Sequence, residues 1–288
     1  MSIVKIIAPV TGSSRDAVVL ATAFALAKPF NAHVEALFIY PDSREAIPVT
    51  EMPMSPMIVQ ELVDTAEEVR KRASKAAKAA LADSAGAAGV KIVGAPCKSD
   101  GVCASYRELT GHLPKRIEDA ARLADLIVFP PISNSDNPEV QDAFVQVLTK
   151  SERAIVLCAE AAPRTIGSNV GIGWDGGLAA AHALVAAIPI LEKAEKVELL
   201  TVGRDANGKR RLQDAKEYLA LHGVKATERA IEQGPRGIGE ALLDSAANDG
   251  CDLLVVGGYG HSRLRESIFG GVTVHLVSHP KLPMLMVH

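Results

Sequence analysis

Five glycines near the end of the sequence are spaced in a way that favours binding of a phosphate group. They stand at positions 257, 258, 260, 270 and 271, after the short apolar run of residues 253–256. Such a run is typical of a buried parallel strand, and the glycines let the backbone turn sharply and approach a ligand. Residues 272–278 are expected to form a helix, which Pro280 and Pro283 stop. Backbone N–H groups and a helix N-terminus then converge on one spot, which suits a phosphate.

The glycine spacing, Gly257-x2-Gly260-x9-Gly270 with x any residue, differs from two familiar phosphate-binding motifs. The second glycine pair comes too late for the dinucleotide-binding fingerprint, and no Gly-Lys-Ser/Thr sequence follows as in a Walker loop. The alternative is a tight strand-to-helix connection that binds no ligand, because glycine-rich turns are common between secondary-structure elements.

Three other residues are candidate ligand contacts. His261 and Ser262 follow the first glycines and either donate hydrogen bonds to phosphate oxygens or simply begin an exposed turn. Trp174, the only tryptophan, either lines a base pocket or fills space between domains. Packing is the commoner role of a tryptophan.

Strands and helices alternate along the whole chain, and their order repeats in the second half. We expect strands at residues 3–9, 34–40, 91–95, 125–129 and 154–158, and again from residue 170 and at 197–202, 226–231, 252–256 and 284–287. Helices are expected at residues 16–28, 57–88, 114–123, 139–149, 178–191, 209–222 and 238–247. The alternation predicts an α/β fold with parallel sheets covered by helices on both faces. The repeat predicts two tandem domains, residues 1–160 and 167–288.

The composition limits the kind of protein and its partners. The 288 residues suffice for two domains. The net charge of −3 lacks the basic excess of nucleic-acid-binding proteins, and no apolar run reaches the ~20 residues of a membrane span. Residues 1–5 have no basic region ahead of apolar ones, so we expect a first strand and no signal peptide. The expected location is the cytoplasm.

The four cysteines are expected to be reduced in that location. Cys158 and Cys251 border apolar strands and are predicted to be buried. Cys97 and Cys103 are expected in a polar loop, with His112 beyond them. A zinc site and two plain loop thiols are the alternatives there. We favour the thiols, because the gap between the cysteines fits no standard zinc-binding spacing.

The glycine spacing and the repeated order of elements resemble the universal stress protein family, as a tandem of two domains over essentially the whole chain. The resemblance implies that each domain is a doubly wound, Rossmann-like, five-stranded parallel sheet of strand order 3-2-1-4-5. It also implies a ligand site where the strand order reverses, between the ends of the first and fourth strands. The family's usual loop is Gly-x2-Gly-x9-Gly-Ser/Thr followed by Val. Here Gly271 replaces the Ser or Thr, and Val272 and Thr273 match.

The resemblance further implies that the second domain binds an adenine nucleotide, which is ATP, ADP or AMP, with Mg²⁺ beside the phosphates. Asp175, at the end of the first strand of that domain, is then expected near the ribose or base, with Trp174 beside the base pocket. Val202, at the end of the second strand, is expected against the adenine ring. The implied phosphate contacts are Gly257, Gly260, His261, Ser262, Gly270, Gly271, Val272 and Thr273, with the Thr273 hydroxyl replacing the one that Gly271 lacks.

The first domain lacks the features of this site. Thr11 stands where the second domain has Asp175, and Pro130 and Pro131 follow the fourth strand in place of glycines. Because proline has no N–H group to donate, we expect no equivalent phosphate site in the first domain.

The two halves are expected to pair through their last strands, residues 154–158 and 284–287. Each is a short apolar run at a predicted sheet edge, and proteins rarely leave such edges open. The partners expected from the sequence are therefore the other domain, a second copy of the chain in a homodimer, and the nucleotide, with no nucleic acid.

The sequence shows no residue arrangement typical of catalysis. It contains no Ser-His-Asp spacing, no metal-binding helix motif and no paired carboxylates beside the glycines, and the resemblance leaves slow ATP hydrolysis open. The predicted function is that of a nucleotide-binding regulatory or stress-response protein. One alternative is an interaction module of the same fold that binds no nucleotide. Another is a nucleotide-dependent ligase or transferase of related architecture, whose signature residues the sequence lacks.

Overall fold

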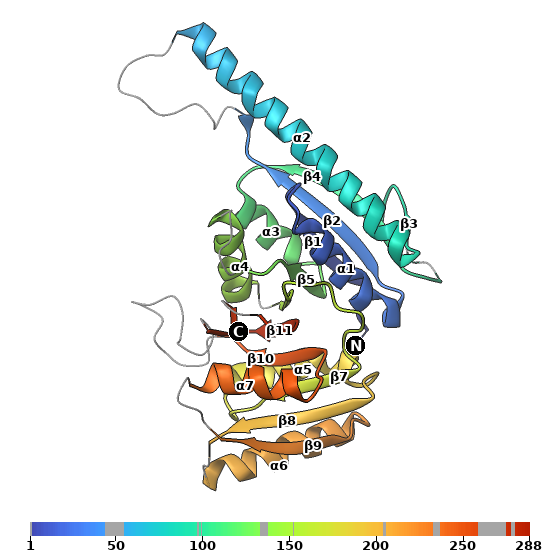
Figure 1. Ribbon diagram of the computed structural model, residues 1–288, viewed down its shortest axis with the longest axis vertical. Coiled ribbons are helices and arrows are strands. Elements are labelled where there is room, and N and C mark those ends of the chain that lie inside the picture. The colour runs from blue at the N-terminus through green and yellow to red at the C-terminus, as the bar shows by residue number, and fades with distance from the viewer. Residues whose placement is uncertain are drawn as a thin grey trace.

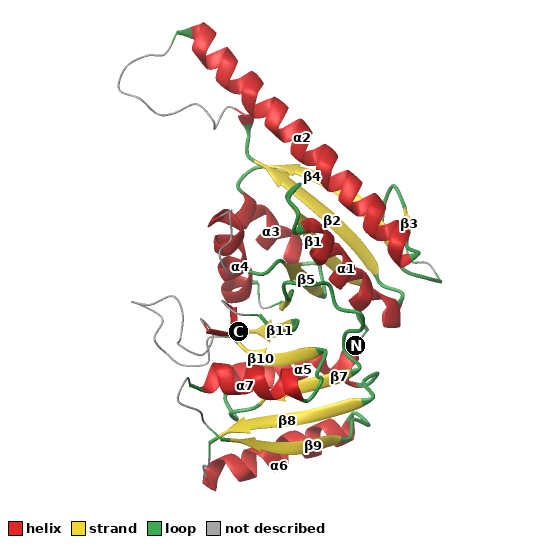
Figure 2. Ribbon diagram, viewed as in Figure 1, coloured by secondary structure: helices red, strands yellow, loops and turns green. Residues whose placement is uncertain are grey.

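Figure 1 shows a computed structural model of the protein, which describes residues 2–43, 55–96, 98, 100–132, 138–151, 153–203, 206–232, 237–258, 275–277 and 280–288. The side chains of residues 206–211 are not part of that description. Within these ranges one continuous 11-stranded sheet runs through the molecule, and helices cover both of its faces (Figure 2).

The order of elements follows the predicted alternation of strands and helices. The first half of the chain supplies β1 (Lys5–Val10), α1 (Asp16–Ala27), the short 3-10 helix η1 (Lys28–Phe30), β2 (His33–Tyr40), α2 (Pro56–Ala88), β3 (Lys91–Ile92), β4 (Cys103–Thr110), α3 (Leu113–Ala121), β5 (Leu126–Phe129), α4 (Pro138–Lys150) and β6 (Ala154–Leu157). The second half supplies β7 (Asn169–Gly173), α5 (Leu178–Leu191), β8 (Lys196–Val202), α6 (Ala206–Leu221), β9 (Ala226–Ile231), α7 (Ile238–Asn248), β10 (Leu253–Gly257) and β11 (Met284–Val287).

Strand order and direction are the same in the two halves. All strand pairs within each half are parallel. The second half has the order β9-β8-β7-β10-β11, which is the predicted order 3-2-1-4-5. The first half repeats it as β4-β2-β1-β5-β6, with β3 added at the edge. The predicted α/β fold class is confirmed, with the sheets of the two halves joined into one.

The junction between the halves is the antiparallel pair of β6 and β11, in which Val156 lies opposite Leu285. This is the pairing that the two apolar edges predicted. Both strands are buried, and their side chains point alternately into the cores on the two faces. Because the pairing uses both edges within one chain, a homodimer would need a different surface.

Two hydrophobic cores, one on each face of the sheet, extend through both halves. One lies beneath α1, α2, α5 and α6 and includes Phe24 and Leu219. The other lies beneath α3, α4 and α7 and includes Ile117 and Phe144. Burial on both faces explains why most of these strands are apolar along their whole length.

The third long strand of the first half is β4, and the prediction for this region was wrong. The stretch around Cys103 was expected to be a polar loop, with the strand just before it. Only Lys91–Ile92 pairs there, whereas Cys103–Thr110 pairs along the whole of β2. The polar character of β4 was misleading, because its Arg107 and Glu108 are compensated by charges far away in the sequence.

Cys103, Cys158 and Cys251 are buried and form no disulfide bond within the described residues. This confirms the prediction for Cys158 and Cys251, and burial raises their pKa values to about 12 and about 11. Cys97 lies outside the described residues. Within the described ranges, no group of three or more His, Cys, Asp or Glu side chains could hold a metal ion. Of the helices in the same ranges, none is long and apolar enough to cross a membrane.

An aspartate anchors the start of the first strand in each half. Asp125, just before β5, accepts the backbone N–H groups of Val4 and Lys5 at 2.8 and 2.9 Å. Asp252, just before β10, accepts the backbone N–H groups of residues 167–169 at 2.9–3.1 Å. The same polar contact therefore fixes β1 beside β5 and β7 beside β10.

An ion pair between a buried glutamate and an exposed arginine also recurs in the two halves. Glu35 on β2 lies 3.4 Å from Arg107 on β4, and Glu198 on β8 lies 3.5 Å from Arg229 on β9. In each pair the glutamate is buried and the arginine comes from the neighbouring strand. The two halves thus share polar contacts as well as strand order.

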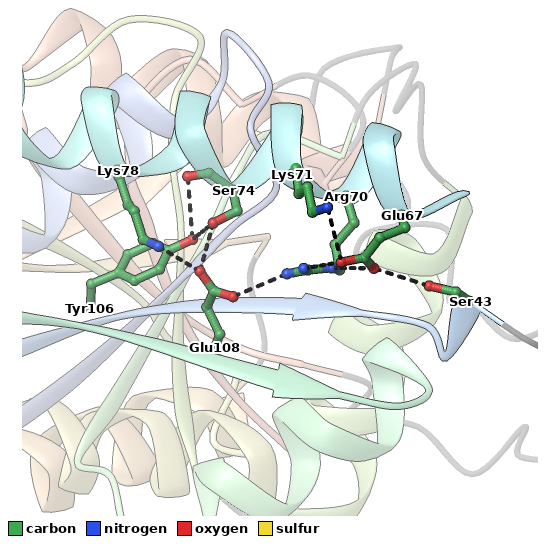
Figure 3. Close-up of polar contacts among 8 residues, drawn as sticks. All are labelled: Ser43, Glu67, Arg70, Lys71, Ser74, Lys78, Tyr106 and Glu108. Carbon is green, nitrogen blue, oxygen red and sulfur yellow. Dashed lines mark hydrogen bonds and ion pairs between the residues drawn. The ribbon is translucent and has the colours of Figure 1, made fainter. Parts of the chain in front are cut away.

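The long helix α2 is fixed to the sheet by a polar network around Glu108 on β4 (Figure 3). Glu108 accepts a hydrogen bond from the Ser74 hydroxyl at 2.6 Å. It forms ion pairs with Lys78 at 2.8 Å and with Arg70 at 3.4 Å. Burial alone would raise the pKa of Glu108, but the hydrogen bonds from Lys78 and Ser74 hold it below its usual value. Docking of α2 therefore depends on an ionised Glu108.

Candidate functional site

The candidate site lies at the carboxyl edge of the sheet in the second half. β7 pairs with β10 on one side and with β8 on the other, so the ends of these three strands are neighbours. Between β7 and β10 the strand order reverses, and doubly wound folds bind ligands in the crevice at such a point. The structure thus brings Trp174, Asp175, Val202 and Gly257 to one edge of the sheet.

Most of the predicted phosphate contacts are outside the described part of the chain. These residues are Gly260, His261, Ser262, Gly270, Gly271, Val272 and Thr273. On the near side, the described chain runs through Gly257 and Gly258 at the end of β10. On the far side, Leu276 and Val277 pack into the core beneath α3, α4 and α7. The roles of the residues between them stay predictions.

Asp175 closes the tight turn that leads from β7 into α5. Its Oδ1 atom accepts the backbone N–H of Gly177 at 2.7 Å, and Gly177 is the N-terminal cap residue of α5. Gly176 has φ of +72°, a left-handed conformation that suits glycine. Among the described side chains none caps α5. The N-terminus of this helix is therefore available to an anion.

The indole of Trp174 has a buried N–H group without an acceptor. Its Nε1 atom has no hydrogen-bond partner among the described residues. The ring is partly buried and packs against the core beneath α1, α2, α5 and α6. A buried donor without a partner costs about 1–3 kcal/mol, and an acceptor on a ligand would remove that cost.

Val202 ends β8 and is partly buried against the core on the other face, beneath α3, α4 and α7. Trp174 packs on the opposite core. The structure therefore does not bring these two side chains together on one face of the sheet. A ligand that contacts both has to lie across the strand ends.

The first two glycines of the loop are closely packed inside the protein, and at Gly257 the neighbour is backbone. A Cβ atom on Gly257 would lie 2.6 Å from the backbone of Ala179 and Ala180, at the start of α5. A Cβ atom on Gly258 would lie 3.1 Å from the side chain of Leu148 on α4, in the first half. From the sequence, these glycines were expected to let the backbone approach a ligand. Neither packing contact was predicted, because the contacting segments are far apart in the sequence.

Two histidines that were not among the predicted site residues form a chain of contacts that ends at Gly258. The Nδ1 atom of His288 is 3.1 Å from the backbone oxygen of Gly258. The Nδ1 atom of His182, on α5, is 3.1 Å from the backbone oxygen of His288. Each ring nitrogen is the donor in its contact, since its partner is a carbonyl oxygen. No local sequence pattern could indicate this chain of contacts, because each residue comes from a different segment.

The equivalent turn of the first half is filled by the carboxylate of Asp16. Strand pairing makes Thr11 equivalent to Asp175 of the second half, and Asp16 equivalent to Ala180. The Asp16 carboxylate, only 2% exposed, accepts the backbone N–H of Thr11 at 3.0 Å and of Gly12 at 2.8 Å. Burial raises the pKa of Asp16, and these hydrogen bonds act in the opposite direction. The first half therefore satisfies the backbone donors of this turn with its own side chain.

Pro130 and Pro131 stand after β5 at the place where Gly257 and Gly258 stand in the second half. Neither proline has an N–H group to offer a ligand. The Arg15 guanidinium donates a hydrogen bond to the backbone oxygen of Pro131 and so ties the loop after β5 to the start of α1. This arrangement supports the prediction that the first half has no phosphate site of the same kind.

Comparison with known proteins adds a family to this geometry. Residues 175–288 match the sequence pattern of the Universal stress protein family. No curated protein matches the chain.

Three solved structures are similar to the chain. A universal stress protein from Archaeoglobus fulgidus DSM 4304 is 16% identical over 98% of this chain and 97% of its own, with a TM-score of 0.65. A putative universal stress protein from Pseudomonas aeruginosa UCBPP-PA14 is 13% identical over 99% of this chain and 93% of its own, with a TM-score of 0.57. A universal stress protein in complex with cAMP is 27% identical over 42% of this chain and 96% of its own, with a TM-score of 0.36.

The first two likenesses show that the fold extends over both halves. The family pattern begins at Asp175 and runs through the whole glycine loop of the second half. Residues 175–288 therefore belong to the universal stress protein family, and the whole chain shares the fold of the first two structures.

Proposed function

We propose that the second half binds an adenine nucleotide, ATP, ADP or AMP, at the edge formed by β7, β8 and β10, and that the protein acts as a nucleotide-binding regulatory or stress-response factor. The observation that carries the proposal is a contrast between two equivalent turns. In the first half the buried Asp16 carboxylate accepts the N–H groups of the turn, whereas in the second half Ala180 stands at that place and the exposed Asp175 carboxylate accepts the N–H of Gly177. A buried negative charge therefore disfavours an anionic ligand at the start of α1, and no such buried charge stands at the start of α5.

The phosphates are proposed to bind between the N-terminus of α5 and the loop that starts at Gly257. Uncapped N–H groups at a helix N-terminus favour an anion through both hydrogen bonds and the helix dipole. The other proposed phosphate contacts are Gly260, His261, Ser262, Gly270, Gly271, Val272 and Thr273. Mg²⁺ would accompany a triphosphate and bind chiefly through its oxygens.

The nucleoside is proposed to lie across the ends of β7 and β8. Asp175 is exposed beside the turn and suits a ribose hydroxyl. The unpartnered N–H of Trp174 suits an acceptor nitrogen of the base, and Val202 supplies an apolar contact from the other face. These roles need the base to cross the strand ends rather than to lie on one face.

We also propose that residues 1–160 and 167–288 are two domains. The repeated strand order, the paired aspartates before β5 and β10 and the paired glutamate–arginine contacts support this division. The first domain then has a structural role through the shared sheet.

A second candidate function is an interaction module of the same fold that binds no nucleotide. The packing of Gly257 against α5 and of Gly258 against Leu148 favours it, because both glycines are then explained without a ligand. A weak ATPase would instead add hydrolysis to the proposed binding.

A charge inserted at the site separates these candidates. Ala180→Asp introduces the carboxylate that the first half has at Asp16, and Ala180→Asn introduces a side chain of similar size without the charge. AMP, ADP and ATP with Mg²⁺ are titrated calorimetrically into the full chain after any bound ligand has been removed. We expect one nucleotide per chain and an affinity about tenfold weaker for Ala180→Asp than for Ala180→Asn, a difference of about 1.4 kcal/mol.

Two results would contradict the proposal. One is the absence of binding by the unmodified protein with all three nucleotides, which would favour the interaction module. The other is an equal affinity of the two variants, which would place the phosphates away from the start of α5.

A further inference from the structure

A cavity of about 80 Å³ lies at the carboxyl edge of the sheet in the first half, where β1 and β5 end. Its walls come from the ends of β1, β2 and β5 and from α1, α3 and α4. Apolar wall residues are Val10, Ile39, Leu113, Ile117, Phe129 and Val140. Exposed Ser13 and Ser14 stand at its rim. The cavity thus occupies the point of strand-order reversal in this half, where doubly wound folds bind ligands.

The walls of this cavity are side chains that the protein otherwise buries. Ile39, Leu113 and Val140 border the space and are 6–8% exposed, whereas Val10, Ile117 and Phe129 lie behind them and are at most 1% exposed. Protein interiors are normally packed without such gaps. A concave apolar space with a few polar groups at its rim is the usual form of a small-molecule site.

The two charged side chains of the cavity lining, Asp16 and Arg15, already have partners inside the protein, since the Arg15 guanidinium donates a hydrogen bond to the backbone oxygen of Pro131. The buried Asp16 carboxylate lines the cavity and already accepts the N–H groups of Thr11 and Gly12. Pro130, also in the wall, has no N–H group. A phosphate or carboxylate would meet a negative charge and no free backbone donor from these residues.

We propose that this cavity binds a small, uncharged, largely apolar molecule of the size of one aromatic ring or a short aliphatic chain. The volume is smaller than that of the engineered apolar cavities of about 150 Å³ that take up benzene, so a ring of that size would extend into the open rim at Ser13 and Ser14. A neutral ligand is expected because the charges of Asp16 and Arg15 already have partners inside the protein. This site differs from the proposed nucleotide site in its half of the chain and in its class of ligand.

Two probes that share a ring test the proposal on the full-length protein. Fluorobenzene is neutral, and para-fluorobenzoate adds one carboxylate; fluorine NMR follows the binding of each. We expect saturable binding of fluorobenzene and at least about tenfold weaker binding of para-fluorobenzoate, which corresponds to about 1.4 kcal/mol. AMP at saturation should leave fluorobenzene binding unchanged, because it is proposed to occupy the other half.

Substitutions on one helix locate the binding. Val140→Phe puts a larger side chain into the cavity wall and should reduce fluorobenzene binding at least about tenfold, or about 1.4 kcal/mol. Val145→Phe makes the same change on the same helix, at a partly buried position outside the cavity lining, and should leave binding unchanged. Ile117→Ala enlarges the cavity and should admit fluoronaphthalene, which the unmodified protein binds weakly. If Val140→Phe does not fold, Ile117→Ala shows whether the ligand binds in this cavity.

The charge of Asp16 is tested separately. Asp16→Asn should still bind fluorobenzene. The difference in affinity between fluorobenzene and para-fluorobenzoate should become smaller. Four results would overturn the proposal: no saturable binding of fluorobenzene, equal binding of both probes to the unmodified protein, no effect of either cavity variant, or displacement of fluorobenzene by AMP. The last result would leave nucleotide binding itself intact and would move its site to the first half.

Discussion

A Cβ atom on Gly257 would lie 2.6 Å from the main-chain carbon of Ala179. The end of β10 and the start of α5 therefore touch backbone to backbone. This contact holds the helix N-terminus close to the strand end, where the proposed phosphate site lies. Glycine at position 257 is thus needed to build the site, whether or not it also contacts a ligand.

We expect Gly257→Ala to lower the free energy of unfolding by about 1–3 kcal/mol, because the added methyl group overpacks the contact with α5. The midpoint of thermal unfolding should fall by a few degrees. Gly86→Ala is the matched control, since nothing lies within 4 Å of that position in α2. It should stabilise the protein by about 0.5–1 kcal/mol through helix propensity. A Gly257→Ala protein as stable as the unmodified one would contradict the packing account.

Nucleotide binding should raise thermal stability through the glycine loop of the second half. A nucleotide at a hundredfold excess over its dissociation constant adds about 2.7 kcal/mol to the free energy of unfolding. Gly260→Val and Gly270→Val should abolish the resulting shift, because a side chain takes the space of the phosphates. Asp175→Ala should reduce it less, and Thr273→Val tests whether that hydroxyl replaces the one missing at Gly271. Differential scanning fluorimetry with AMP, ADP and ATP measures all five proteins, and an undiminished shift in both glycine variants would refute the assignment.

Docking of α2 should depend on the charge of Glu108. Glu108→Gln keeps the shape of the side chain but weakens its contacts with Ser74, Lys78 and Arg70. We expect a loss of about 1–2 kcal/mol in the free energy of unfolding, since hydrogen bonds to charged groups contribute more than neutral ones. Glu68→Gln, on α2 itself, is the control, because the ion pair of Glu68 with Arg72 is largely exposed. Its loss should lower the free energy of unfolding by less than about 1 kcal/mol.

The pH dependence of this network has a definite sign. The pKa of Glu108 is lower in the folded protein than its usual value. Its contribution is therefore complete above the ordinary glutamate pKa of about 4.3 and is lost as the pH falls through the folded pKa. Urea unfolding at several acidic pH values should show this loss in the unmodified protein. The loss should be smaller in Glu108→Gln, and identical profiles would contradict the role given to the charge.

His33 should make the protein less stable in mildly acidic solution. Its Nδ1 atom is 3.1 Å from Cys103 Sγ and its Nε2 atom is 2.8 Å from Ser105 Oγ, in a buried position. Burial lowers the pKa of His33. The negative charge of Glu35 raises this pKa, the positive charge of Lys5 lowers it further, and the net shift is downward. Below about pH 6.5 the unfolded chain takes up a proton that the folded protein does not. The free energy of unfolding should therefore decrease as the pH falls from about 6.5 toward the folded pKa.

Urea unfolding at neutral and mildly acidic pH measures the His33 effect. His33→Gln should remove this part of the pH dependence, even if the variant is less stable at every pH. His222→Gln, at an exposed position, is the control and should keep it. Equal slopes in the unmodified protein and in His33→Gln would show that another group titrates in this range.

The α/β architecture and most element positions were predictable from the sequence. The helix Leu178–Leu191 and the strands Ala226–Ile231 and Met284–Val287 lie where they were predicted. Their signals are local, since a buried parallel strand is apolar throughout and a helix has an apolar face of fixed period. The repeat of these signals also predicted the equal strand order of the two halves.

The strand β4 was missed because its signal is not local. Arg107 and Glu108 make Cys103–Thr110 look like a loop until Glu35 and α2 are placed beside it. Charges on a strand are tolerated when partners from other elements compensate them. Those partners are brought close only by the tertiary structure.

By itself, the sequence determined the fold class, the glycine loop as the candidate anion site and the unsuitability of Pro130 and Pro131 for the same task. Only the tertiary structure decided that Asp16 fills the turn of the first half, and that Gly257 has no room for a side chain. It alone also decided that Trp174 and Val202 approach the edge from opposite faces. The physical reason is that composition and periodicity act over a few residues, whereas excluded volume and hydrogen bonding act between segments that meet only after folding.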